Sequence, residues 1–288
     1  LGTVMGGSLI NPHIAQSLLS FDIPFMNSGI DTPAEAALSV IMVTYLVASL
    51  INFRIPETGA RYPHQARNPI KLITDFSHCF MTLWRDKLGQ ISLAVTTLFW
   101  GAGATLQFIV LKWAEKALHM PLDQAAALQG VTAIGIALGA TAAAHFIPLK
   151  KSLNVMPLGV LMGIIVTSMT LIHSVWFAYP LLIIIGALAG FYVVPMNALL
   201  QHRGHVLMSA GHSIAVQNFN EQACILALGG LYAAASAMGL SAFNAIVCFG
   251  VIVAGNMWLI QRWHQSNCKH HAQEVERLLD IARQDPSH

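Results

Sequence analysis

One acidic residue, Glu221, lies inside an otherwise apolar stretch of the chain. A carboxylate within hydrocarbon costs about 3 kcal/mol or more, so it requires a partner or a function. Gln217 and Asn218 precede Glu221 by four and three residues, and on a helix the three would share one face. We expect that face to point inward. It is either a polar patch lining a path through the interior or a packing network near the membrane interface.

A second polar pattern precedes it in the chain. A stripe with spacings of three and four residues is formed by Thr96, Trp100, Gly103 and Gln107. Such a stripe is typical of a cavity-lining helix face, although Trp and Gln also pair structurally between neighbouring helices. Asn197 and Gln201 form a similar pair near the end of another apolar segment, where solvation at the interface is the alternative explanation.

Other residues with reactive side chains do not form a recognisable active site. His202 and His205 have no third ligand at a fixed spacing, so we predict a basic loop at headgroup level there rather than a metal site. His119 and Asp123 stand one residue too close for the H-x-x-x-x-D pair of glycerolipid acyltransferases. The sequence also contains no P-loop and no nucleophile elbow. We therefore predict no catalytic residue, metal, cofactor or nucleic-acid partner, and no enzyme activity.

Composition indicates that a bilayer surrounds these residues. Hydrophobic residues make up 55% of the 288 residues and charged residues only 10%. A membrane helix needs about 20 largely uncharged residues, and several stretches of the chain provide them. Eight spans are predicted near residues 1–20, 33–53, 91–111, 124–147, 153–173, 177–200, 212–237 and 241–261. The fold class is an all-α membrane protein.

The basic residues predict the orientation of these spans. Alternate loops and the tail hold thirteen of the fifteen Lys and Arg residues: Arg54, Arg61, Arg67, Lys71, Arg85, Lys87, Lys150, Lys151, Arg203, Arg262, Lys269, Arg277 and Arg283. Only Lys112 and Lys116 fall on the other side. Positively charged loops stay in the cytoplasm, so the C-terminus is predicted to be cytoplasmic.

The order of the segments suggests four regions. Residues 1–53 hold two spans, 54–90 a polar linker, 91–262 six spans and 263–288 a tail. This layout fits the end of one six-helix half and the whole second half of a major facilitator bundle, so we expect the first four helices to be missing. Asn68-Pro69 predicts the start of an amphipathic linker helix, either interfacial or soluble and packed on the bundle. A further short helix is predicted in the tail.

Two small-residue motifs predict close helix contacts. Gly135 and Gly139 are separated by three residues in one apolar segment, and Gly186 and Gly190 in another. Glycines at this spacing let two membrane helices approach closely, although such motifs are common.

Three runs of sequence carry a resemblance to a known family. They are TLFWGAGATLQ at 97–107, GFYVVPMNALLQHRG at 190–204 and SAGHSIAVQN at 209–218. They resemble the bacterial lysophospholipid transporter family of the major facilitator superfamily, and the resemblance extends over nearly the whole chain. It implies a flippase of the bacterial inner membrane that brings lysophosphatidylethanolamine to the cytoplasmic leaflet by alternating access. It also implies membrane lipids as surroundings and a cytoplasmic acyltransferase as a partner.

The sequence departs from that family at Gln107, where the resemblance implies an arginine. A neutral amide contacts a phosphate less strongly than a charged donor does, which leaves the headgroup preference open. Two other classes also remain open: a drug or small-solute exporter of the same superfamily, and a membrane protein that transports nothing.

Overall fold

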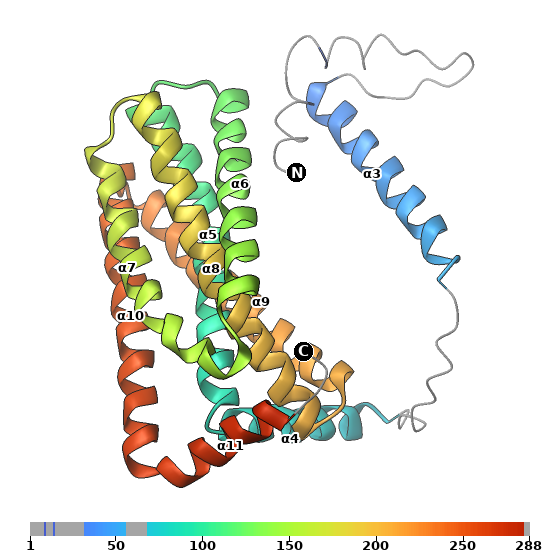
Figure 1. Ribbon diagram of the computed structural model, residues 1–288. Helices are drawn as coiled ribbons and strands as arrows, with labels where there is room; N and C mark the ends of the chain where they lie inside the picture. Colours follow the sequence, from blue (N-terminus) through green and yellow to red (C-terminus); the bar gives the residue numbers. More distant parts are fainter. Residues whose placement is uncertain (1–8, 10–13, 15–31, 56–67, 285–288) are drawn as a thin grey trace.

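The computed structural model describes residues 9, 14, 32–55 and 68–284, and these contain helices and no strand (Figure 1). The α-helices are α3 (Pro33–Asn52), α4 (Pro69–Arg85), α5 (Gly89–Ala117), α6 (Leu122–Phe146), α7 (Met156–Thr167), α8 (Val175–Leu207), α9 (Ala210–Ala237), α10 (Ala242–His270) and α11 (Ala272–Gln284). Two 3-10 helices, η1 (Leu149–Val155) and η2 (Ser168–Leu171), flank α7. The predicted all-α class is confirmed.

Local signals explain where several helices begin. Asn68 accepts a hydrogen bond from the Ile70 N–H at 3.0 Å, and Pro69 opens α4 as the sequence predicts. Ser241 caps α10 in the same way, by accepting the Asn244 N–H at 3.2 Å. Gly239, with φ of 89°, makes the turn between α9 and α10, because a side chain would disfavour that backbone conformation.

Helices α5 to α10 form the bundle, and its most extensive contacts join α6 to α8, α7 to α10 and α5 to α9. The two glycine motifs meet between α6 and α8. A Cβ at Gly135 or Gly139 would overlap backbone of α8, and one at Gly186 or Gly190 would overlap backbone of α6. The predicted close contact is therefore confirmed, because each glycine motif makes room for the backbone of the other helix.

Helices α4 and α11 lie across one end of the bundle, called the base below (Figure 1). Phe76 of α4 packs edge-on against Phe219 of α9, with 5.3 Å between ring centroids. In α11, Val275 and Leu278 are buried against Leu88 and Leu199. The predicted linker and tail helices are both present, and both pack on the bundle.

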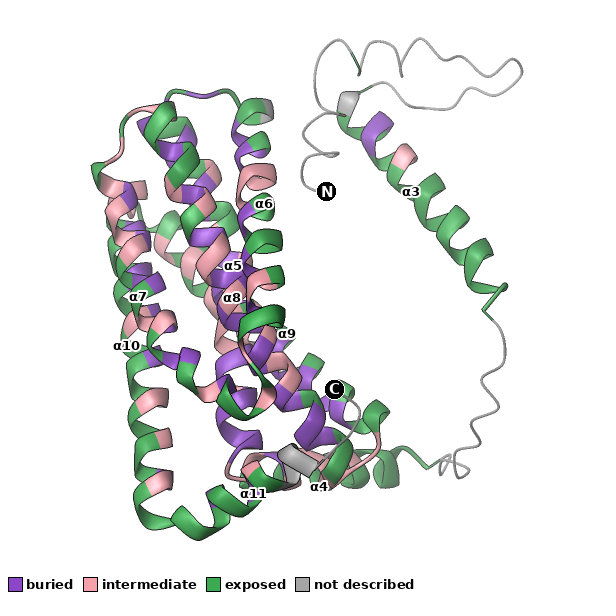
Figure 2. Ribbon diagram, viewed as in Figure 1, coloured by how far each residue is buried: buried purple, intermediate pink, exposed green. Residues whose placement is uncertain are grey.

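Helix α3 stands apart from the bundle and is exposed along most of its length (Figure 2). Its exposed side chains include Leu38, Met42, Tyr45, Leu46 and Leu50. A helix that is apolar on all sides requires lipid or other helices around it rather than water.

Six helical segments are long and apolar enough to cross a membrane: Ala34–Asn52, Gly89–Ala117, Gln124–Phe146, Leu149–Leu171, Val175–Leu207 and Ala242–His270. Helix α9 is long enough, but the amides and the carboxylate in its first half lower its hydropathy. The first predicted span, near 1–20, lies outside the described residues. The count of eight spans therefore remains a prediction.

The structure corrects the predicted basic loop around Arg203. His202, Arg203, Gly204 and His205 lie within α8, which continues to Leu207. His202 and Arg203 are buried rather than placed on a headgroup-level loop. The prediction ended the span at the first charge, but α8 continues because a buried carboxylate neutralises the guanidinium.

Candidate functional site

A cavity of about 400 Å³ lies among α5, α6, α7, α8, α9 and α10. Most of its lining is aliphatic or aromatic. The lining residues are Phe99, Trp100, Ala102, Gly103, Ala104, Leu106, Gln107, Val110, Gln129, Thr132, Ala133, Ile136, Met162, Val166, Leu182, Ile185, Ala189, Ile225, Phe249 and Val253. This volume lies within the range of about 300–1,000 Å³ that is usual for ligand pockets.

One side of this cavity is polar. Gln129 of α6 donates a hydrogen bond to the backbone carbonyl of Gln107 at 3.2 Å, joining α6 to α5. Trp100 and Gln107 both line the cavity and are both exposed, so the cavity is open beside them. Thr132 also lines the cavity, and its hydroxyl donates to the Leu128 carbonyl at 3.1 Å. An amphiphile could therefore place an apolar portion inside and a polar portion at this edge.

The predicted stripe on α5 is only partly a cavity lining. Trp100, Gly103 and Gln107 line the cavity, as expected for a shared helix face. Thr96 does not line it. It is fully buried, and its hydroxyl donates to the Leu93 carbonyl one turn earlier at 3.2 Å.

The buried acid has amide partners. Gln217 donates to a carboxylate oxygen of Glu221 at 2.7 Å and to the side-chain oxygen of Asn197 at 3.0 Å. Gln217 is 9% exposed and Glu221 is 8% exposed. Among the described residues, no Lys, Arg or His forms an ion pair with Glu221. This Asn197–Gln217–Glu221 network therefore joins α8 to α9 through neutral donors only.

Two of the predicted site residues belong neither to the cavity lining nor to the Asn197–Gln217–Glu221 network. Asn218 and Gln201 are exposed, whereas Asn220 is buried and donates to the Val216 carbonyl at 2.8 Å. The inward face of α9 is thus defined by residues 217, 220 and 221, and Asn218 is turned away by about 100° from Gln217. We correct the expectation that Asn218 points inward with its neighbours.

The network and the cavity follow one face of α9. Ile225, which lines the cavity, stands one turn after Glu221 on that face. Between them Cys224 packs against α5, where a Cβ at Gly101 would collide with the Cys224 sulfur. Glu221 lies about three turns from the first residue of α9, which is deeper than a position at the helix end.

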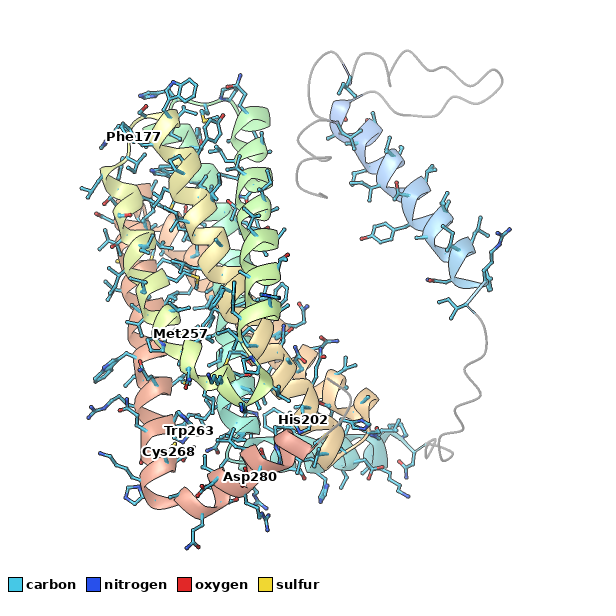
Figure 3. The ribbon with its side chains drawn as sticks, viewed as in Figure 1. Phe177, His202, Met257, Trp263, Cys268 and Asp280 are labelled. Atoms are coloured by element: carbon cyan, nitrogen blue, oxygen red, sulfur yellow. The ribbon has the colours of Figure 1, made fainter. Side chains whose placement is uncertain are left out.

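An ion pair at the base was not predicted from the sequence. Two nitrogens of Arg203 bind the two carboxylate oxygens of Asp86 at 3.1 and 2.6 Å, and both side chains are almost completely buried. Asp86 also accepts the Gly89 N–H at 2.7 Å and so caps the start of α5. His202, labelled in Figure 3, lies at the same end of the bundle. One indication of this pair is present in the sequence: charged residues stand just before α5 and near the end of α8.

Together the bundle and its interior define a class: a multi-pass α-helical membrane protein with a buried carboxylate and an amphiphilic internal cavity. Within the described residues, no cluster of His, Cys, Asp and Glu could hold a metal ion.

Comparison with known proteins identifies the family. The chain is 36% identical over 269 residues to "Lysophospholipid transporter LplT" of Escherichia fergusonii, covering 92% of this chain and 62% of the relative. A relative of the same name from Pectobacterium carotovorum is 41% identical over 71% of this chain and 51% of its own length. The Photorhabdus laumondii relative of that name is 37% identical over 80% of this chain and 59% of its own. The chain belongs to the lysophospholipid transporter family, as its sequence runs predict.

The matched region is a part of these relatives, because the chain spans about half to three-fifths of their length. No protein-family model matches the chain. No solved structure matches it either.

Proposed function

We propose that this chain forms part of a transporter that moves lysophospholipids across the bacterial inner membrane. The observation that carries the proposal is the amphiphilic cavity: aliphatic and aromatic walls with Trp100, Gln107 and Gln129 at an open edge. A lysophospholipid has one acyl chain and one polar headgroup, and these two parts suit the wall and the edge respectively. Relatives named as lysophospholipid transporters support the same substrate class.

The proposed substrate is of the lysophosphatidylethanolamine type, and the proposed direction is toward the cytoplasmic leaflet. Gln107 would contact the headgroup through neutral hydrogen bonds, which are roughly half as strong as those from a charged donor. Glu221, one turn from the cavity wall at Ile225, would then supply a negative charge for an ethanolamine ammonium. We propose Trp100, Gln107, Asn197, Gln217 and Glu221 as the substrate path.

For the topology, we propose that α9 crosses the membrane together with the six apolar segments and the segment near 1–20. This arrangement places α4, α11 and thirteen of the fifteen Lys and Arg residues on the cytoplasmic side. The bundle of α5 to α10 would be one half of a major facilitator fold that rocks against the other half. The base would then face a cytoplasmic acyltransferase that consumes the delivered lysolipid.

The test is uptake of labelled lysophosphatidylethanolamine by proteoliposomes that contain the full-length protein, compared with empty vesicles. The proposal predicts uptake that saturates with substrate and is competed by other lysophospholipids. If nothing moves, but the same vesicles transport cationic drugs or small solutes, the exporter alternative replaces the proposal. Uptake of diacyl phospholipid at the same rate would contradict a single-chain substrate.

A further inference from the structure

A second cavity, of about 460 Å³, lies at the end of the bundle opposite the base. Helix α5 starts at the base with Gly89 and is about 43 Å long, so its last turns lie at the far end. Lys112 and Lys116 in those turns line the second cavity, as do Tyr232 and Ser236 of α9. Residues 239–243 and 245, from the turn and the start of α10, complete it.

These two lysines are the exceptions in the charge distribution, since the predicted topology places the other thirteen Lys and Arg residues on the cytoplasmic side. They stand four residues apart, on one face of α5, and both are exposed. Like charges at this spacing destabilise a helix slightly. Within the part of the chain that the structure describes, neither lysine forms an ion pair, and the neighbouring Glu115 does not line the cavity.

Neutral hydrogen-bond donors face the same space. Ala242 and Phe243 are the first residues of α10, where backbone N–H groups have no acceptor within the helix. The Ser241 hydroxyl accepts the Asn244 N–H, and the Ser241 carbonyl accepts the Ala245 N–H. The start of a helix with unpaired N–H groups attracts anions, and two lysines beside it strengthen that attraction. Hydroxyls of Tyr232 and Ser236 add further donors.

The two cavities share three helices. Helix α10 contributes Ala245 to the second cavity and Phe249, one turn on, to the first. Helix α5 contributes Val110 to the first and Lys112 to the second. The cationic cavity thus follows the apolar cavity along the bundle axis.

We propose that the Lys112/Lys116 cavity is a binding site for the phosphate of a lysolipid headgroup on the non-cytoplasmic side, where the lipid is received before it reaches the apolar cavity. Its role in transport rests on the proposed function, whereas phosphate binding at the lysines does not. The site supplies a positive charge that Gln107 lacks, so this chain would recognise the phosphate near the end of α5.

Binding is tested directly by protection of lysines from a membrane-impermeant acetylating reagent. The full-length protein is placed in nanodiscs of phosphatidylcholine, and acetylation is measured by mass spectrometry. Lysophosphatidylglycerol, which has a phosphate but no amine, should slow modification of Lys112 and Lys116 at least threefold and leave Lys150 and Lys151 unchanged. Monoacylglycerol, which lacks the phosphate, should protect neither pair.

Glycerol phosphate distinguishes a lipid headgroup from a soluble phosphoester as the ligand of the lysines. Weaker protection by glycerol phosphate than by lysophosphatidylglycerol supports a headgroup site beside the acyl-chain cavity. Protection by glycerol phosphate alone would replace the lipid with a soluble phosphoester and overturn the proposal. Protection by neither compound, or equal protection by monoacylglycerol, would also overturn it.

Transport supplies the second test. Lys112→Gln/Lys116→Gln should weaken the apparent affinity for lysophospholipid about tenfold, because two exposed charged contacts are lost. Lys112→Arg/Lys116→Arg should retain most of the affinity. The matched control is Lys150→Gln/Lys151→Gln, which removes two exposed charges at the base.

The two proposals fail in different ways. Equal uptake by the Lys112/Lys116 and Lys150/Lys151 double variants would overturn the proposed role of the lysine site in receiving the lipid and leave lysolipid transport standing. Absence of uptake by the unmodified protein, together with intact protection of the lysines, would remove only the transport function.

Discussion

Two buried carboxylates, Asp86 and Glu221, are satisfied in opposite ways. Asp86 forms a two-point ion pair with Arg203 and also caps α5. Glu221 accepts one hydrogen bond from the neutral Gln217 and has no cation beside it within the described residues. A fully paired charge fixes two helices in place, whereas an acid with neutral partners keeps an interaction available for a ligand. We therefore expect the first to contribute mainly to stability, and the proposed function gives the second a role in substrate handling.

The largest effect is expected at the ion pair. Arg203→Met would leave Asp86 buried without a counter-charge, and breaking such a pair costs about 3–5 kcal/mol. We expect a marked loss of thermal stability in detergent, measured as a lower temperature at which the monodisperse protein is lost. The double variant Arg203→Met/Asp86→Asn should recover part of this loss, because no unpaired charge remains. A single variant as stable as the unmodified protein would contradict the structural role.

A smaller effect on stability is expected from removing the bridging amide. Gln217→Leu would leave Asn197 and Glu221 without their shared donor, and an unsatisfied buried polar group costs about 1–3 kcal/mol. The midpoint temperature of thermal unfolding should fall less than for Arg203→Met. Uptake of lysophospholipid should also decline. Gln217→Glu tests the charge separately, since a second carboxylate would repel Glu221.

The comparison is sharpened by Glu221→Gln, which preserves shape and an acceptor oxygen for Gln217. Stability should change by less than about 1 kcal/mol, because a neutral amide is less costly to bury than an acid. Uptake should fall about tenfold, equivalent to about 1.4 kcal/mol. An unchanged rate of uptake would place Glu221 in a packing network instead.

The smallest effect is expected at Asn218, which is exposed on the other side of α9. Asn218→Ala should alter uptake by less than about twofold, and exposed substitutions usually change stability by no more than about 0.5 kcal/mol. A loss of uptake as large as that of Glu221→Gln would show that the substrate also contacts this exposed face.

Much of the fold could be predicted because its signals are local. Asn68-Pro69 starts α4, Gly239 ends α9, and the paired glycines predict the contact of α6 with α8. Hydropathy alone fails where buried polar residues interrupt an apolar helix. Helix α9 is absent from the set of apolar spans although it forms a full-length helix in the bundle.

The missed features depend on contacts between distant residues. Arg203 is buried because Asp86, 117 residues earlier, lies beside it, and no spacing rule reveals such a pair. The sequence placed Gln217, Asn218 and Glu221 on the inward face of α9, whereas the structure buries Gln217, Asn220 and Glu221 and exposes Asn218. On a helix one residue is a rotation of about 100°, enough to move a side chain from the interior to the surface.

The central claim is that lysophospholipid passes through the cavity beside Trp100 and Gln107, and filling that cavity tests it most directly. Gly103 lines the cavity, and a Cβ there would meet no atom within 4 Å, so the side chain of Gly103→Phe can start without a backbone clash and add its ring to the cavity. The matched control is Gly255→Phe, at an exposed helical glycine that is equally free of neighbours and does not line the cavity. Uptake of labelled lysophosphatidylethanolamine by the full-length protein should fall at least tenfold for Gly103→Phe and remain near normal for Gly255→Phe. Equal uptake by both folded variants would contradict the account.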